Sequence, residues 1–330
     1  MAVVTRVVVC GLGGTIAMTA GPDGRLAPAL RAGDLIAAVP GLAALGLELE
    51  LLDVARVPSA SLRTADVVGL ARRIGALLAA GADGVVVTQG TDTLEECAYL
   101  LDLLHERPEP VVVTGAMRHP LLAGADGPAN LLAALTVAAD PGARGRGVLV
   151  AFADEVHAAA RVRKAHSTSL TAFVSATGGP VGRLVEGRVR YLAGPAPRVV
   201  LPRPAGDGLP RVPLIVAALG ADAPEPDLAA DGLVVAAFGV GHLPEWWAEP
   251  LAELALRMPV VLASRTLAGP VLADTYGYAG SERDLLERGL IPAGFLEPVK
   301  ARMLVLAVLA AGGGRAEVRD ALAVAGGPGG

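Results

Sequence analysis

The sequence predicts an α/β protein with two domains: a larger N-terminal domain on a doubly wound parallel sheet and a smaller C-terminal α/β domain. Short apolar runs typical of buried strands alternate with helical segments through the first half of the chain. A stretch rich in Pro and Gly, without helical periodicity, divides the chain at residues 194–211. A length of 330 residues with 53% hydrophobic content supplies enough apolar surface for two cores.

The predicted elements of the N-terminal domain, residues 1–193, alternate between strand and helix. In order they are a strand at 3–10, a short helix at 33–38, a strand at 48–54, a helix at 64–80 capped by Thr64 or Ser61, a strand at 85–88, a helix at 94–104 and a strand at 111–114. This βαβ order predicts a parallel sheet with right-handed crossovers.

The segment 194–211 is predicted to be an interdomain linker. The C-terminal domain then covers residues 212–330. Its predicted strands, at 214–218, 232–237 and 259–263, alternate with helices and indicate a second, smaller α/β sheet.

Composition excludes several classes of function. The net charge is -5, and no cluster of Lys and Arg is interleaved with aromatic residues, so no nucleic-acid partner is expected. The five histidines show no metal-binding spacing such as H-x-x-x-H, and we expect no metal. Small neutral or zwitterionic ligands fit this composition better.

The cysteines and the apolar segments predict a cytoplasmic protein without a membrane partner. Only Cys10 and Cys97 are present, both at apolar positions, which excludes a disulfide framework and predicts buried small hydrophobes. The apolar run at 303–311 is too short to span a bilayer. Arg6 lies inside the first apolar run, which reaches the first glycine motif within fifteen residues and leaves no room for a cleavable leader.

Two threonine turns carry most of the chemical information. GGTIA at 13–17 and TQGTDT at 88–93 each follow a buried-type strand, so each places a hydroxyl at the carboxyl end of a parallel strand. Glycines before the threonine allow a sharp turn and leave the hydroxyl and nearby N–H groups open to a ligand. This arrangement suits acyl transfer.

GLGGTI at 11–16 also resembles the start of a dinucleotide-binding fingerprint. However, Ile16 occupies the third glycine position, and the acidic residue required about twenty positions further on is matched only by Asp34, at a helix start. The threonine interpretation is therefore favoured, and no cofactor is expected.

Six motifs in order give the chain a resemblance to a known family. They are GGTIAM at 13–18, TQGTDTLEE at 88–96, VTGAMR at 113–118, DGPANL at 126–131, the basic stretch RVRK at 161–164 and PVKARMLV at 298–305. Together they resemble the bacterial L-asparaginase family and cover nearly the whole chain. The resemblance implies an amidohydrolase that converts L-asparagine to L-aspartate and ammonia through a threonyl acyl-enzyme.

The resemblance also implies roles for individual residues. Thr15 is the expected nucleophile, while Thr91, Asp92 and Lys164 form a second relay in which a desolvated Lys164 activates Thr91 or a water. Ser59 is expected to hold the α-carboxylate of the substrate, and Asp92 its α-amine. On a strand, Val162, Lys164 and His166 share one face while Arg161 and Arg163 point to the other, so Lys164 is expected to face the site.

The chain departs from the family pattern at several places. Position 60 is Ala60 where many members carry a polar residue, and the loop at 19–26 lacks the tyrosine that members usually carry there. The loop around Tyr276 and Tyr278 is a candidate substitute. Glu282 and Asp274 are candidates for the acid that a second subunit usually supplies, and we therefore expect a homodimer or homotetramer.

Three alternatives stay open at this point. A glutaminase, or an asparaginase-like amidotransferase component acting on charged transfer RNA, would share the motifs, although the latter usually has an added N-terminal domain. A two-lobed amino-acid-binding protein would share the doubly wound architecture without needing the Thr91–Asp92–Lys164 relay. The preference between asparagine and glutamine is not predicted.

Overall fold

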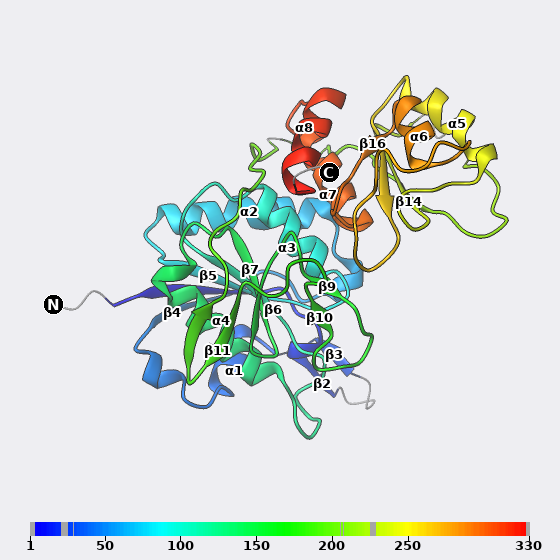
Figure 1. Cartoon of the computed structure of the whole chain (residues 1–330). Coiled ribbons are helices and arrows are strands. Elements are labelled where there is room, and N and C mark those ends of the chain that lie inside the picture. Colours follow the sequence, from blue (N-terminus) through cyan, green and yellow to red (C-terminus); the bar gives the residue numbers. More distant parts are fainter. Residues whose placement is uncertain are drawn as a thin grey trace. The chain divides into compact units, whose positions relative to one another are not determined.

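The computed structural model describes residues 4–20, 26–28, 30–204, 206, 208–224 and 229–327. The chain separates into two compact units, Met1–Ala196 and Pro197–Gly330, each with its own sheet. The linker over residues 194–211 stays a prediction. The α/β class and the division into a larger and a smaller domain agree with the expectation from the sequence (Figure 1).

The first unit contains an eight-stranded sheet in the order β12-β11-β8-β7-β6-β5-β1-β4. Five strands are parallel: β1 Arg6–Gly11, β4 Glu48–Asp53, β5 Gly84–Thr88, β6 Val111–Thr114 and β7 Val148–Phe152. Four of them, β1, β5, β6 and β7, are rich in valine and almost entirely buried. Continuous burial of this kind is typical of parallel strands that are covered on both faces.

Three further strands make the sheet mixed, which the sequence interpretation missed. β8 Glu155–Ala158, β11 Gly182–Val185 and β12 Arg188–Tyr191 are antiparallel to their neighbours. The physical cause is a pair of two-residue turns with positive φ at both central positions, Ala153–Asp154 and Glu186–Gly187. Such turns match the twist of antiparallel strands and reverse the chain directly, without a crossover helix.

Helices cover both faces of the first sheet (Figure 1). α2 Thr64–Ala79 and α3 Leu94–Leu103 pack together on one face, and α1 Ala32–Ala37 and α4 Gly127–Ala139 pack together on the other. The predicted cap of α2 by Thr64 or Ser61 is wrong, because the N-cap is Arg63 and the Asp66 carboxylate accepts its N–H at 2.8 Å.

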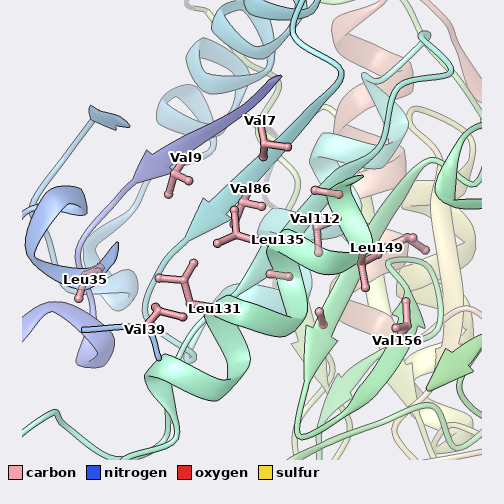
Figure 2. Packing of buried hydrophobic residues seen from close by; sticks show 14 of the residues in the cluster. Val7, Val9, Leu35, Val39, Val86, Val112, Leu131, Leu135, Leu149 and Val156 are labelled. Carbon is pink, nitrogen blue, oxygen red and sulfur yellow. The ribbon is translucent and has the colours of Figure 1, made fainter. Parts of the chain in front are cut away.

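The core beneath α4 follows the alternation of strand side chains. Val7 and Val9 of β1 point to this face, and Figure 2 shows them with Val86, Leu131 and Leu135 in one apolar cluster. The intervening Val8 and Cys10 are equally buried. Burial raises the pKa of the Cys10 thiol to about 11 and that of Cys97 to about 12, so both are inert apolar residues, as expected.

Short elements complete the first unit. They are the 3-10 turns η1 Thr15–Ala17, η2 Leu42–Leu45, η3 Ser59–Ser61 and η4 Pro141–Ala143, the pair β2 Met18–Ala20 with β3 Leu26–Pro28, and the pair β9 Arg163–Lys164 with β10 Phe173–Val174. Both pairs are antiparallel.

The second unit is a four-stranded parallel sheet with helices. Its elements are β13 Leu214–Val216, β14 Leu233–Ala237, β15 Val260–Ser264, β16 Ile291–Pro292, α5 Glu245–Ala255, α6 Glu282–Glu287, α7 Pro298–Ala310 and α8 Arg315–Ala325. Trp247 and Leu251 of α5 anchor one of its apolar clusters. Among the described residues, no helix has the length and apolar character needed to cross a membrane.

Candidate active site

The two threonine turns lie against each other at the carboxyl end of the sheet. β1 and β5 are parallel neighbours with Gly11 opposite Thr88, and the Leu12 N–H donates to the Thr88 carbonyl at 2.9 Å. Gly14 has a φ of 85°, and a Cβ atom there would lie 2.0 Å from the Gly90 nitrogen. Only glycine permits this backbone contact, which brings the Thr15 turn next to the turn that carries Thr91.

Thr15 begins the 3-10 turn η1 and is partly buried. The next residue, Ile16, is 2% exposed and anchors the turn in the apolar core under α4. The Gly14 carbonyl accepts the Ala17 N–H at 3.0 Å and closes the turn. The hydroxyl of Thr15 is thus held on a rigid backbone beside the second turn, as a nucleophile requires.

Lys164 contacts both polar side chains of the second turn. Its Nζ lies 2.9 Å from Thr91 Oγ1 and 2.9 Å from Asp92 Oδ1. The Lys164 side chain is 16% exposed, whereas that of Asp92 is 63% exposed and open to a ligand. The Lys164 amine therefore lies within hydrogen-bonding distance of both Thr91 and Asp92, while the relay itself stays a prediction.

Ser59 is attached to the same turn. Its Oγ accepts the Asp92 N–H at 3.1 Å, and its carbonyl accepts the Thr93 hydroxyl at 2.9 Å. A Cβ atom on Gly90 would lie 2.6 Å from Ser59 Oγ, so this serine lies against the contact between the two turns. Ser59 is 2% exposed, and its hydroxyl proton can still donate to a ligand oxygen.

The motifs VTGAMR at 113–118 and DGPANL at 126–131 form the segments that lie next to these turns. Asn130 Nδ2 donates to the Gly115 carbonyl at 3.0 Å, and the Asp126 carboxylate accepts the N–H groups of Met117 and Arg118, both at 2.9 Å. A Cβ atom on Gly115 would lie 2.5 Å from the Gln89 carbonyl oxygen, so this glycine allows the segment 113–118 to pack closely against the second turn. In these contacts, the side chains of Asp126 and Asn130 hold the backbone of the segment 115–118 in place.

The predicted facing of the basic stretch holds only in part. β9 covers only Arg163 and Lys164, so strand alternation does not extend to His166. His166 is exposed, and its Nδ1 accepts the N–H groups of Thr168 and Ser169 at 3.1 and 2.9 Å. Arg161 lies outside β9 and is partly buried, with its Nη1 inaccessible to solvent.

The loop around Tyr276 belongs to the second unit and contains a cluster that the sequence did not reveal. Glu282 is fully buried, and its Oε1 accepts the N–H groups of Thr275 and Tyr276 at 3.0 and 2.8 Å while His242 Nε2 lies 3.0 Å from its Oε2. Both oxygens of this candidate acid are thus engaged within its own unit. Burial opposes its ionisation, but these hydrogen bonds hold the pKa of Glu282 below its ordinary value.

The other sequence candidates have simpler outcomes. Asp274, Tyr276 and Tyr278 are exposed. Of the predicted loop at 19–26, residues 21–25 lie outside the described part of the chain, while Thr19 lies in β2. Among the described residues, no group of three or more His, Cys, Asp or Glu side chains is arranged to hold a metal ion.

Comparison with known proteins gives matches along both units. A family model described as "Asparaginase, N-terminal" matches residues 6–197, and one described as "Glutaminase/Asparaginase C-terminal domain" matches residues 215–322. A "Probable L-asparaginase" of Deinococcus radiodurans is 42% identical, covering 95% of this chain and 96% of the relative. A "Glutaminase-asparaginase" of Pseudomonas fluorescens is 37% identical, covering 58% and 54% respectively.

A solved structure supports the same conclusion. The crystal structure of a "Probable Cytoplasmic L-asparaginase" from Campylobacter jejuni has a TM-score of 0.84 and 30% identity, covering 96% of this chain and 99% of that chain. Family models that together span most of the chain and a relative above 40% identity over nearly its full length establish the family. The chain belongs to the asparaginase family.

Proposed function

We propose that the protein hydrolyses L-asparagine to L-aspartate and ammonia through an ester on Thr15. The observation that carries this proposal is the contact of Lys164 with both Thr91 and Asp92, beside the Gly14–Gly90 contact that holds the Thr15 turn in place. Two hydroxyls, an amine largely shielded from solvent and a solvent-exposed carboxylate lie at one edge of the sheet. Amide hydrolysis requires groups of these kinds.

Two steps complete the reaction. In the first, Thr15 Oγ1 bonds to the side-chain amide carbon of the substrate, ammonia leaves, and the hydroxyl proton departs with it. In the second, a water attacks the ester carbon, Lys164 accepts the water proton through Thr91, and Lys164 then gives this proton to the Thr15 oxygen as that oxygen leaves. For this step Lys164 has to be neutral when the substrate is bound.

Ser59 and Asp92 supply recognition of the amino-acid end of the substrate. The Ser59 hydroxyl donates to the α-carboxylate, and the exposed Asp92 carboxylate accepts from the α-ammonium group. Because the Asp92 N–H is bound to Ser59 Oγ at 3.1 Å, the two groups are held at a fixed separation. This fixed spacing favours a free amino acid over a peptide.

Ammonia release from L-asparagine and L-glutamine, measured in parallel, tests the proposal. We expect release from asparagine, and an aspartyl ester on Thr15 in acid-quenched enzyme by peptide mass spectrometry. Glutamine is the alternative substrate, since the Pseudomonas fluorescens relative is named for both activities. Binding of asparagine without ammonia release would contradict the proposal and favour an amino-acid-binding protein.

We further propose a cytoplasmic homodimer or homotetramer. The location is supported by the similarity to the Campylobacter jejuni protein, whose title describes it as cytoplasmic. The assembly is supported by Trp246, Tyr276 and Tyr278, large apolar side chains that are 53%, 43% and 53% exposed on the second unit. Light scattering at assay concentration tests the assembly, and an active monomer would contradict it.

A further inference from the structure

We propose that His157, a residue outside the catalytic groups, positions Lys164 through the side chain of Ser175. The proposal rests on the proposed function of Lys164. It adds a positioning residue to that site, and it depends on how the short strand that carries Lys164 is attached to the main sheet.

The strand that carries Lys164 has little support of its own. β9 has two residues and pairs with the two residues of β10, with Lys164 opposite Phe173 and Arg163 opposite Val174. The Ala165 N–H, which donates to the Ala172 carbonyl at 2.7 Å, extends this ribbon by one residue. An isolated two-stranded ribbon is marginally stable in water. The place of the Lys164 ammonium beside Thr91 is therefore set by whatever anchors this ribbon.

On the β9 side, a backbone hydrogen bond of Lys164 itself joins the ribbon to a helix. The Lys164 N–H donates to Glu95 Oε2 of α3 at 3.1 Å. Glu95 is part of the TQGTDTLEE motif, so this bond joins the ribbon to the helix that follows the second threonine turn. This bond holds the β9 backbone at Lys164 beside α3. The other strand of the ribbon, β10, is held by different contacts.

On the β10 side, two contacts attach the ribbon to the β7–β8 hairpin. The ring of Phe173 packs against Phe152 at the end of β7, with centroids 4.7 Å apart. Two residues further on, Ser175 Oγ lies 3.0 Å from His157 Nδ1 on β8. His157 is 0% exposed and Ser175 7% exposed, so water does not compete for this bond.

The surroundings of the imidazole ring set the direction of the bond. His157 Nε2 lies 3.5 Å from Glu155 Oε2, and Glu155 also pairs with Arg183 at 2.6 Å. A carboxylate at this place favours the proton on Nε2, which leaves Nδ1 to accept the Ser175 hydroxyl proton. The buried pair of His157 and Ser175, with the partly exposed Glu155 beside it, thus reaches the residue that follows the strand opposite Lys164.

This pair is unsuited to catalysis of its own. The Ser175 hydroxyl is buried and directed to the ring, and the hairpin strand β8 is packed between β7 and β11. A buried polar pair that joins a short ribbon to a sheet defines position, because breaking it leaves an unsatisfied group in the interior. A misplacement of about 1 Å in a catalytic group can cost on the order of 10²-fold in rate.

Three variants test the role of this hydrogen bond. His157→Leu and Ser175→Ala should each lower kcat about tenfold to a hundredfold with a smaller change in KM, because the bond positions a catalytic group and does not bind the substrate. His157→Asn places an amide oxygen near the position of Nδ1, where it can accept the Ser175 hydroxyl proton, and should restore most of the loss. The double variant should be no slower than the slower single variant, because both remove one bond.

The control is Val156→Ala on the same strand. Val156 is 0% exposed and does not belong to the His157–Ser175 pair, so this variant loses packing while keeping the hydrogen bond. It should keep the kcat and the KM of the wild type. Equal losses in Val156→Ala and His157→Leu would show that the hairpin acts only through general stability and would overturn the inference.

Lys164→Met separates this inference from the proposed function. If Lys164→Met is inactive while Ser175→Ala and His157→Leu keep the wild-type kcat, positioning by His157 is wrong and the function of Lys164 stands. If Lys164→Met keeps full activity, the proposed function of Lys164 itself is wrong. Ser175→Ala removes a single oxygen atom, so it remains a test if His157→Leu fails to fold.

Discussion

Gly14 and Gly90 touch backbone to backbone, and this contact defines the distance between the two threonine turns. A Cβ atom on Gly14 would lie 2.0 Å from the nitrogen and 2.2 Å from the Cα of Gly90. Both atoms belong to main chain that is continuous with β5, so neither can move aside cheaply. Any side chain at position 14 has to push the turns, and with them Thr15 and Thr91, apart.

Gly14→Ala is therefore expected to abolish activity and to lower the free energy of unfolding of the first unit by about 3 kcal/mol or more. Gly41→Ala is the matched control, since Gly41 has a φ of 77° and no atom within 4 Å of its Cβ position. It should cost only about 1 kcal/mol, from backbone strain, and keep activity. Circular dichroism during urea unfolding measures the difference in the free energy of unfolding between the two variants. An active Gly14→Ala enzyme would refute the contact.

Removing either threonine hydroxyl should abolish most of the ammonia release. Thr15→Ala and Thr91→Ala are each expected to lower kcat on the order of 10³-fold or more. When catalytic groups act together, the removal of one of them removes most of the activity. Thr15→Ser keeps a hydroxyl and should retain part of the activity. Circular dichroism confirms folding. Near wild-type release by either folded alanine variant would mean that this threonine has another role.

Lys164 and its neighbour on β9 provide a matched pair. Lys164→Met should remove activity, since it leaves Thr91 Oγ1 and Asp92 Oδ1 without the amine that lies 2.9 Å from each. Arg163→Met should cost little, because adjacent strand residues point to opposite faces. Steady-state kinetics on both purified variants decide this, and comparable losses would show that the facing of the two side chains is misassigned.

The proximity of the two threonine turns could be predicted from the sequence because it depends on local rules. Thr15 and Thr91 follow glycines at the ends of valine-rich strands, and parallel neighbours bring those ends to one edge. The antiparallel strands β8, β11 and β12 were missed because their signal is two positive-φ turns, and Ala153–Asp154 carries no glycine to mark one of them. The partners of Glu282 were missed because His242 is forty residues away in sequence.

Glu282 should make the stability of the second unit depend on pH. Its pKa in the folded protein lies below the ordinary value, because hydrogen bonds from Tyr276, Thr275 and His242 outweigh the opposing effect of burial. The unfolded state therefore takes up the proton first. The stabilisation is fully present above the ordinary pKa of 4.5 and is lost as the pH falls through the lower folded pKa.

Comparison of Glu282→Gln with the wild type isolates this contribution. The variant should be less stable at pH 7, and the difference should shrink as the pH falls below about 4.5. Trp246 and Trp247 are the two tryptophans of the chain, so tryptophan fluorescence during urea unfolding reports the second unit alone. A difference that is constant between pH 7 and pH 4 would contradict the assignment.

The last prediction concerns the tyrosine that the first loop lacks. Tyr276 and Tyr278 pack edge-on against His242, with ring centroids 4.9 and 5.4 Å away, and both rings are about half exposed. A phenylalanine keeps these ring contacts and removes only the hydroxyl. If Thr91 and Lys164 provide the relay, Tyr276→Phe and Tyr278→Phe should keep kcat near the wild-type value.

If the hydroxyl of Tyr276 or Tyr278 takes part in catalysis, the same assay gives a different result. General acid–base groups contribute roughly 10²- to 10⁴-fold, so a catalytic tyrosine would be obvious from kcat alone. Light scattering on each variant confirms that the assembly is intact, which separates loss of a hydroxyl from loss of a subunit contact. A drop of about a hundredfold in kcat for either variant, with the assembly unchanged, would replace the Thr91–Lys164 relay with that tyrosine.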